Sequence, residues 1–180
     1  MQVESIKLTS STDKNYFENL YKTAFLKEER VDIQTLYDLN GDNLIEIDIL
    51  KVDEKNIGLA VIYLNQDIHL LSYFAIDSKY RGQGLGSRAL ALLKEKYDDL
   101  IIEIESTNFK NADDYAIRNR RKAFYIKNGY KVLDDRINYF GIEMELMATT
   151  KDAGLDEYFD TYRNIFDKDY INENIKIIEN

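Results

Sequence analysis

Apolar residues recur at helical spacing early in the chain and at strand spacing after residue 44. Behind N-capping residue types at 10–13, a stripe of aromatic and aliphatic side chains predicts a first helix, and a shorter helix is predicted at 31–39. Three strand-like runs follow, at 44–52, 57–64 and 68–76. Because the turns that join them are short, we expect an antiparallel meander.

For two of these strands, the sequence predicts a different number of buried faces. Isoleucines at 45, 47 and 49 alternate with Glu46 and Asp48, which is typical of a strand with one exposed face. The run at 68–76 is almost entirely apolar, as expected for a strand that is buried on both faces.

The pattern changes after Ile76, where a glycine-rich loop at 77–86 precedes a predicted helix at 87–97 and a strand at 100–105. This strand–loop–helix–strand order predicts a right-handed parallel crossover. The remaining predictions are a strand at 3–8, a helix that follows Asp113 and Asp114 and ends at Asn128-Gly129, strands at 130–133 and 142–147, and one or two helices in 152–180 with a frayed end. The predicted sheet is therefore mixed, and the fold class is α/β (α+β).

Composition and charge narrow the classes of function. The chain has 180 residues, no Cys and a formal net charge of −9. An acidic surface disfavours nucleic acid and anionic membranes as partners, and no apolar run approaches the roughly 20 residues of a membrane span. Without a disulfide framework or a signal sequence, we expect a cytoplasmic protein. An anionic cofactor would have to be held locally, by backbone amides and a few basic side chains.

Three alternating glycines, at 82, 84 and 86, meet that requirement. They stand immediately before a predicted helix, where free amides and the positive end of the helix dipole can hold a pyrophosphate. Lys79, Arg81 and Arg88 add positive charge to this part of an acidic chain.

Two other phosphate-binding loops fit less well. A P-loop requires a Lys that is absent here. A dinucleotide-binding loop requires its third Gly where Ser87 stands, and it follows its strand directly. Glu103 does lie about 20 residues further on, where that loop type places its ribose-binding carboxylate. However, the dinucleotide fold begins with its fingerprint strand, whereas a helix and a meander come first here.

The segment at 81–86, Arg-Gly-Gln-Gly-Leu-Gly, resembles the acetyl-CoA signature (Gln or Arg)-x-x-Gly-x-(Gly or Ala) of the GNAT superfamily of N-acetyltransferases. The segment at 74–77 and Tyr80 resemble the family's approach to this loop. The segment at 123–130, Ala-Phe-Tyr-Ile-Lys-Asn-Gly-Tyr, resembles its second signature, a helix ending in Tyr-x-x-x-Gly-aromatic. The resemblance implies a GNAT-like domain at 1–148, with a C-terminal helical extension at 149–180.

The resemblance also implies the cofactor, acetyl-CoA, and its place between two splayed parallel strands, 68–76 and 100–105. Pantetheine then binds the backbone of the first strand, and the pyrophosphate binds amides of the loop. The implied cofactor-binding residues are Phe74, Ala75, Ile76, Arg81, Gly82, Gln83, Gly84, Leu85, Gly86, Ser87 and Tyr125. One position departs from the family, because Arg118 stands where many members have an Asn that contacts the cofactor.

For the chemistry, the resemblance implies direct attack of an amine on the thioester in a ternary complex, without a metal. Tyr125 matches the family's Tyr that protonates the leaving thiolate, although it can also be one more core aromatic. No motif identifies the base. Glu103 and Glu105 share a strand face, where they can bind a cationic amine and act as a base, or can simply be solvated.

Other polar residues are weaker candidates. Glu29 and Arg30 follow the first helix, which flanks the acceptor site in this fold, so they are candidate substrate contacts or part of a solvated charge run. His69, the single histidine, is expected to cap its strand or to be partly exposed rather than to act as a base.

We therefore expect an acetyl-CoA-dependent N-acetyltransferase that acts on a primary amine of a small-molecule or amino-acid-like acceptor. Two alternatives stay open. One is a non-catalytic acyl-CoA-binding or sensor module, and the other is a protein N-terminal or lysine acetyltransferase. The Tyr-rich tail can also serve as the surface of a homodimer.

Overall fold

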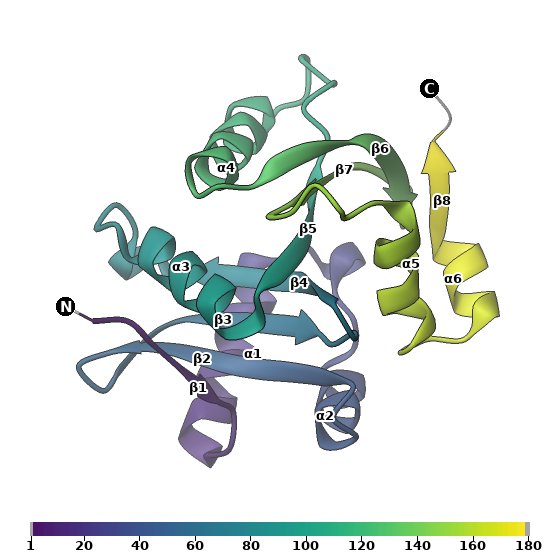
Figure 1. The fold of residues 1–180 in the computed structure, drawn as a ribbon. Helices are drawn as coiled ribbons and strands as arrows, with labels where there is room; N and C mark the ends of the chain where they lie inside the picture. The colour runs from purple at the N-terminus through teal and green to yellow at the C-terminus, as the bar shows by residue number, and fades with distance from the viewer. Residues whose placement is uncertain (1, 179–180) are drawn as a thin grey trace. The chain divides into compact units, whose positions relative to one another are not determined.

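A computed structural model describes residues 2–178 as a mixed α/β fold that consists of two compact units (Figure 1). The first unit comprises residues 2–64 and 71–98, and the second comprises residues 65–70 and 99–178. The described strands, eight in number, are mostly antiparallel with one parallel pair, which confirms the predicted fold class. The elements are β1 (Glu4–Lys7), α1 (Ser11–Ala24), a 3-10 turn (Lys27–Glu29), α2 (Ile33–Gly41), β2 (Ile45–Val52), β3 (Lys55–Tyr63), β4 (Ile68–Ile76), a second 3-10 turn (Ser78–Tyr80), α3 (Leu85–Tyr97), β5 (Asp99–Glu105), α4 (Tyr115–Lys127), β6 (Lys131–Tyr139), β7 (Ile142–Ala148), α5 (Leu155–Arg163), α6 (Lys168–Asn174) and β8 (Ile175–Ile178).

The first unit is built on β1, β2, β3 and β4, which are hydrogen-bonded neighbours in that order and include the predicted meander. Helix α1 packs on β3, α2 packs on β2, and α3 packs on β1 (Figure 1). Apolar side chains of the sheet and of α3 form a continuous core. This cluster contains Val3, Leu50, Val52, Ile57, Ile76, Leu85 and Ala89.

The helices of this unit begin at polar caps. Ser10 caps α1 by accepting a hydrogen bond from the Asp13 amide at 3.0 Å, as the sequence predicted. Asp32 caps α2 in the same way, which places the second helix two residues later than predicted. Within residues 2–178, no helix is both long enough and apolar enough to cross a membrane.

The prediction of an exposed face on β2 is wrong. Glu46 is only 7% exposed and Asp48 is fully buried. The end of α3 covers this face, where the Lys96 ammonium binds both carboxylates and the Tyr97 hydroxyl donates to Glu46 at 2.6 Å. The alternation of apolar and charged residues therefore marks two buried faces, one apolar and one ionic.

The second unit begins with the parallel pair, in which Ile68–Leu70 of β4 lie beside Asp99–Ile101 of β5. This pairing confirms that the two strands joined by the predicted crossover are parallel. Strand β5 then pairs with β7, β7 with β6, and β6 with β8, all antiparallel (Figure 1). Helix α4 packs on β5 and β6, and α6 packs on α5 and β8.

One strand prediction and one helix prediction in this unit need correction. Strand β6 is longer than the predicted 130–133, because the ladder with β7 shifts register between Val132 and Arg136 and so accommodates the charged residues there. The segment 149–180 is not purely helical, since Ile175–Ile178 pairs with β6 as β8. The last few residues were predicted to be frayed, and of these 179–180 lie outside the described residues.

Candidate active site

The glycine loop has the backbone conformation that an anion cradle requires. Gly82 and Gly84 take left-handed conformations, with φ of +76° and +74°. Gly84 is the N-cap of α3 and provides no side-chain cap. The first amides of α3, those of Leu85, Gly86 and Ser87, have no intrahelical acceptor by helix geometry, so they can bind an external anion.

Two polar side chains of the loop fold back onto its own backbone. The Arg81 Nε donates to the Ile76 carbonyl at 2.9 Å, and the Gln83 amide donates to the Lys79 carbonyl at 3.3 Å. Asp77 accepts from the Lys79 amide at 3.1 Å and starts the 3-10 turn. These bonds fix the path of the loop from the end of β4 to the start of α3.

The three residues predicted to bind pantetheine do not all direct their backbone groups to the same edge of β4. The Asp77 amide donates to the Ile57 carbonyl of β3 at 2.9 Å. Backbone groups alternate between the two edges of a strand, so Ala75 also faces β3, while the backbone groups of Phe74 and Ile76 face the other edge. Phe74 and Ile76 are therefore better placed than Ala75 to hydrogen-bond a ligand at that edge.

Tyr125 lies in α4 and is 7% exposed. Its ring contacts the Tyr130 ring edge to face, with centroids 5.4 Å apart. The left-handed Gly129, with φ of +90°, ends the helix, and the Tyr130 amide then donates to the Tyr125 carbonyl at 3.1 Å. The Tyr-x-x-x-Gly-Tyr spacing therefore serves to pack one tyrosine against the other.

Burial raises the pKa of Tyr125 to about 12, and the nearby Arg121 opposes this shift. The phenol is therefore protonated at neutral pH and can donate a hydrogen bond. In the described part of the chain, no hydrogen-bond acceptor is found for this hydroxyl.

The two candidate bases have different partners. Glu105 is buried and forms an ion pair with Arg121 of α4. Glu103 is half-buried and accepts hydrogen bonds from Tyr158 at 2.6 Å and Tyr162 at 3.0 Å. The shared strand face thus holds two carboxylates in different chemical surroundings.

Sequence reasoning missed the role of Tyr158 and Tyr162 as partners of Glu103. The only signal was their spacing of four residues in an aromatic stripe, which predicts packing but no particular polar contact.

The segment that holds the candidate acceptor contacts, Glu29 and Arg30, is held in place by hydrogen bonds with tyrosine side chains. The Tyr73 hydroxyl donates to the Glu29 carbonyl at 2.8 Å and accepts from the Val31 amide at 3.1 Å. The Tyr21 hydroxyl donates to the Val31 carbonyl at 2.9 Å. Arg30 folds back to the Lys22 carbonyl at 3.3 Å. Glu29 and Arg30 therefore lie in a rigid segment rather than a loose charged run.

Three other polar residues have structural partners. His69 accepts from the Asn65 amide through Nδ1 at 3.0 Å, at the turn before β4. Arg118 pairs with Asp114 at 2.8 Å. Asn119 donates to the Tyr115 carbonyl at 2.9 Å. Among residues 2–178, no three His, Asp or Glu side chains gather as a set of metal ligands.

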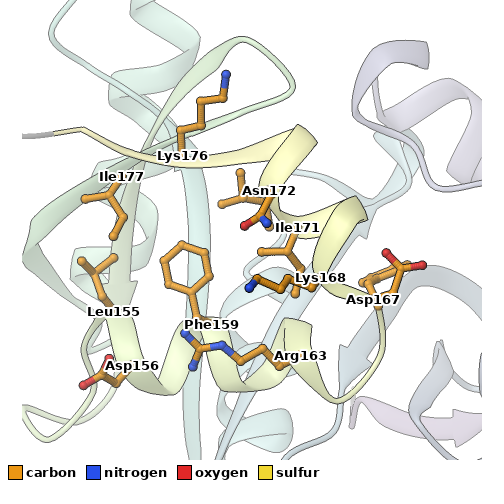
Figure 2. Close-up of a pocket in the computed structure, with 12 residues that line it drawn as sticks. Leu155, Asp156, Phe159, Arg163, Asp167, Lys168, Ile171, Asn172, Lys176 and Ile177 are labelled. Carbon is orange, nitrogen blue, oxygen red and sulfur yellow. The ribbon is translucent and has the colours of Figure 1, made fainter.

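A separate cavity of about 850 Å³ lies in the C-terminal extension, between α5, α6 and β8 (Figure 2). Phe159 stands at its centre, with Leu155 and Ile177 beside it and charged residues such as Arg163 and Lys168 around it (Figure 2). None of the predicted site residues lines this cavity.

Comparison with known proteins finds a family model that matches the central part of this chain. Residues 45–132 match the family model of the acetyltransferase (GNAT) domain. The comparison with curated proteins gives no match.

Solved structures agree with the family model. A GNAT-family protein from Bacteroides thetaiotaomicron is similar at 19% identity and a TM-score of 0.73, over 91% of this chain and 95% of that one. The ribosomal-protein-S18-alanine N-acetyltransferase from Escherichia coli is similar at 18% identity and a TM-score of 0.61, over 86% and 100%. A GNAT acetyltransferase from Elizabethkingia anophelis, solved with acetyl-CoA bound, is similar at 20% identity and a TM-score of 0.57, over 82% and 97%.

At these identities, the neighbours establish the fold and not the acceptor. The family model, in turn, covers the segment that holds the glycine loop, Glu103 and Tyr125. The resemblance predicted from sequence is confirmed, since residues 45–132 match the GNAT acetyltransferase domain model and the fold is shared with GNAT-family structures.

Proposed function

We propose that this chain is an acetyl-CoA-dependent N-acetyltransferase that acts on a primary amine of a small-molecule or amino-acid-like acceptor. The observation that carries the proposal is the uncapped start of α3 behind two left-handed glycines, within a GNAT domain. The Elizabethkingia anophelis neighbour was solved with acetyl-CoA bound, which supports the same acyl donor here.

The residues of β4 and the loop fit this donor. The amides of Leu85, Gly86 and Ser87 bind the pyrophosphate, since α3 offers them no acceptor, whereas the Arg81 amide already donates to the Ser78 carbonyl at 3.3 Å. The backbone of Phe74 and the amide of Ile76 hydrogen-bond the pantetheine arm, because these groups face the edge of β4 that is not paired with β3, while the Ile76 carbonyl already accepts from Arg81 Nε. When bound, the donor supplies an activated thioester, which the protein holds in position.

In the transfer step, the acceptor nitrogen attacks the thioester carbonyl, the C–N bond forms and the C–S bond breaks. Positioning of the two reactants can supply roughly 7–11 kcal/mol of the barrier reduction. With a pKa of about 12, the Tyr125 phenol holds its proton more tightly than a thiol, whose pKa is about 8.5. Tyr125 therefore stabilises the leaving thiolate as a hydrogen-bond donor, and solvent completes its protonation.

Of the two carboxylates, Glu103 is the better proton acceptor. Glu105 is paired with the Arg121 guanidinium, which stabilises its charged form. Glu103 is held by neutral hydroxyls and is half-buried, so it can take the proton that the amine loses. Glu29 and Arg30, in their rigid segment, are the proposed acceptor contacts.

Calorimetric titration with acetyl-CoA, with NADH as the control, tests the donor. We expect micromolar binding of acetyl-CoA and no binding of NADH. Binding of NADH instead would support the dinucleotide alternative and would contradict the proposal.

Tyr125→Phe separates an enzyme from an acyl-CoA sensor. Loss of the donor to the leaving sulfur should lower kcat by about 10²–10³-fold, with the Kd for acetyl-CoA unchanged. Tyr130→Phe is the matched control, because the Tyr130 hydroxyl is buried without a hydrogen-bond partner in the described residues and its removal should leave kcat unchanged. Tight acetyl-CoA binding without turnover of any amine in the wild type would instead support the sensor.

A protein N-terminal acetyltransferase is the second candidate, supported by the fold shared with the Escherichia coli S18-alanine enzyme. A peptide panel beside the small-amine screen distinguishes the two acceptors. The homodimer stays a prediction, which light scattering of the purified chain tests.

A further inference from the structure

Two tyrosines of the C-terminal extension hold the carboxylate of Glu103. The Tyr158 hydroxyl donates to Oε2 at 2.6 Å, and the Tyr162 hydroxyl donates to Oε1 at 3.0 Å. Both tyrosines are fully buried, whereas Glu103 is half-buried. Each oxygen of the carboxylate therefore has its own donor, while part of the residue still reaches solvent.

The geometry of α5 fixes both donors together. Tyr158 and Tyr162 are one helical turn apart, so they project from the same face, and their ring centroids are 5.0 Å apart. The helix begins at a cap in which Glu157 accepts from the Gly154 amide at 2.9 Å. Because the rings are packed and the helix is anchored, the carboxylate is oriented by a rigid element.

Two further phenols belong to this cluster, and the same face of β5 carries the ion pair of Glu105 with Arg121. Burial raises the pKa of Tyr170 in α6, a hydrogen bond with Tyr139 of β6 lowers it, and the negative charge of Glu103 raises it. Burial raises the pKa of Tyr158, and the charge of Glu103 raises it further. Tyr158 and Tyr170 are therefore neutral at physiological pH, and the hydrogen bonds that Glu103 accepts favour its ionised form.

We propose that Tyr158 and Tyr162 are positioning residues that fix Glu103 as the proton acceptor for the amine, so that the C-terminal extension sets the pH range of catalysis. This inference rests on the proposed acetyl transfer. In that step an N–H bond of the amine breaks, and the proton passes to an oxygen of Glu103. Each hydroxyl that stabilises the ionised carboxylate lowers the pH at which Glu103 becomes able to accept this proton.

The test is the pH dependence of kcat/KM for Tyr158→Phe and Tyr162→Phe, measured on the full chain with acetyl-CoA and an amine that the wild type acetylates. Each variant loses one donor to Glu103 and keeps its ring. We expect the acidic limb of the profile to move to higher pH by about one unit, so that activity falls about tenfold on that limb and recovers at alkaline pH. A variant that only loosened the fold would lose activity at every pH.

Two controls make the result specific. Tyr170→Phe removes a hydroxyl of the same cluster that bonds to Tyr139, and its acidic limb should coincide with that of the wild type. Glu103→Gln removes the proton acceptor, so kcat/KM should fall by about 10²–10⁴-fold and the limb should disappear. Calorimetry should give the same Kd for acetyl-CoA in all four variants.

The inference is overturned if turnover occurs and the limb stays at its wild-type pH in both Tyr158→Phe and Tyr162→Phe. It is also overturned if Glu103→Gln retains the wild-type profile. A wild type that binds acetyl-CoA but acetylates no amine overturns the proposed transfer itself, which is a different result.

Discussion

Gly82 and Gly84 of the glycine loop differ from an ordinary helical glycine in their backbone angle φ. Gly84 has a φ of +74° with open space around it, whereas Gly41 ends α2 without a left-handed φ. Gly84→Ala should therefore lower the free energy of unfolding by about 1–2 kcal/mol and weaken acetyl-CoA binding. Gly41→Ala should leave stability unchanged or raise it by up to about 1 kcal/mol.

Thermal denaturation and calorimetry of both variants check this prediction. Equal melting temperatures and equal acetyl-CoA affinities for the two would show that the left-handed conformation of Gly84 has no role.

At this scale, the sequence predicted what depends on neighbours in the chain. The glycine loop and the Tyr125–Gly129 spacing are local signals, and the structure shows the left-handed glycines and the packed tyrosine pair that they require. The partners of Glu103 come from residues more than 50 positions later, so no local pattern could identify them.

At the scale of elements, an ionic contact joins α3 to β2. Lys96 binds the buried carboxylates of Glu46 and Asp48. Lys96→Gln would leave both without a counter-charge from α3, and we expect a loss of about 3–5 kcal/mol in the free energy of unfolding. Lys22→Gln is the control, because its pair with Glu18 is exposed and should contribute less than about 0.5 kcal/mol.

Urea denaturation at pH 7 measures both variants. If Lys96→Gln were no more destabilising than Lys22→Gln, the contact would not anchor α3 to the sheet.

The same elements show why some predictions from sequence failed. Strand β2 has the alternation of a half-exposed strand, but contacts from Lys96 and Tyr97 of α3, and from Ser5 and Lys7 of β1, bury its polar face. Strand β8 has only four residues, and its strand conformation depends on pairing with β6. Such short segments take their conformation from tertiary contacts rather than from propensity.

For the whole molecule, buried and paired carboxylates predict sensitivity to acid. Burial alone would raise the pKa of Asp13, Glu46, Glu143 and Glu145, but hydrogen bonds and neighbouring cations outweigh it and lower all four, that of Glu46 to about 2. Their contribution to stability is complete above their ordinary pKa and is lost as the pH falls toward the lowered values. Burial raises the pKa of Asp48, which acts in the opposite direction.

Because four of these carboxylates have a lowered pKa and one has a raised pKa, we expect acid to destabilise the fold. The free energy of unfolding should fall between pH 5 and pH 3, by about 1.4 kcal/mol per pH unit for each extra proton that the unfolded chain binds. Urea denaturation across this range provides the measurement, and a flat profile would contradict the assignment.

The order of the helices and strands was predicted from the sequence, but their grouping into two compact units was not. The succession of elements, the parallel crossover and the mixed sheet follow from periodicity and loop length. The division at 148 into a domain and an extension stays a prediction, while the contacts group 65–70 and 99–178 together. Grouping depends on contacts between distant segments, which sequence periodicity does not contain.

The position of β8 in the chain has a consequence for biosynthesis. The first unit is complete once the ribosome has passed Asp98, so its core can assemble while the remainder is translated. Strand β6 instead leaves the ribosome well before β8, its only partner on that side among the described strands. Nascent chains therefore pass through a stage with an unprotected β6 edge, which could pair with another chain until β8 is made.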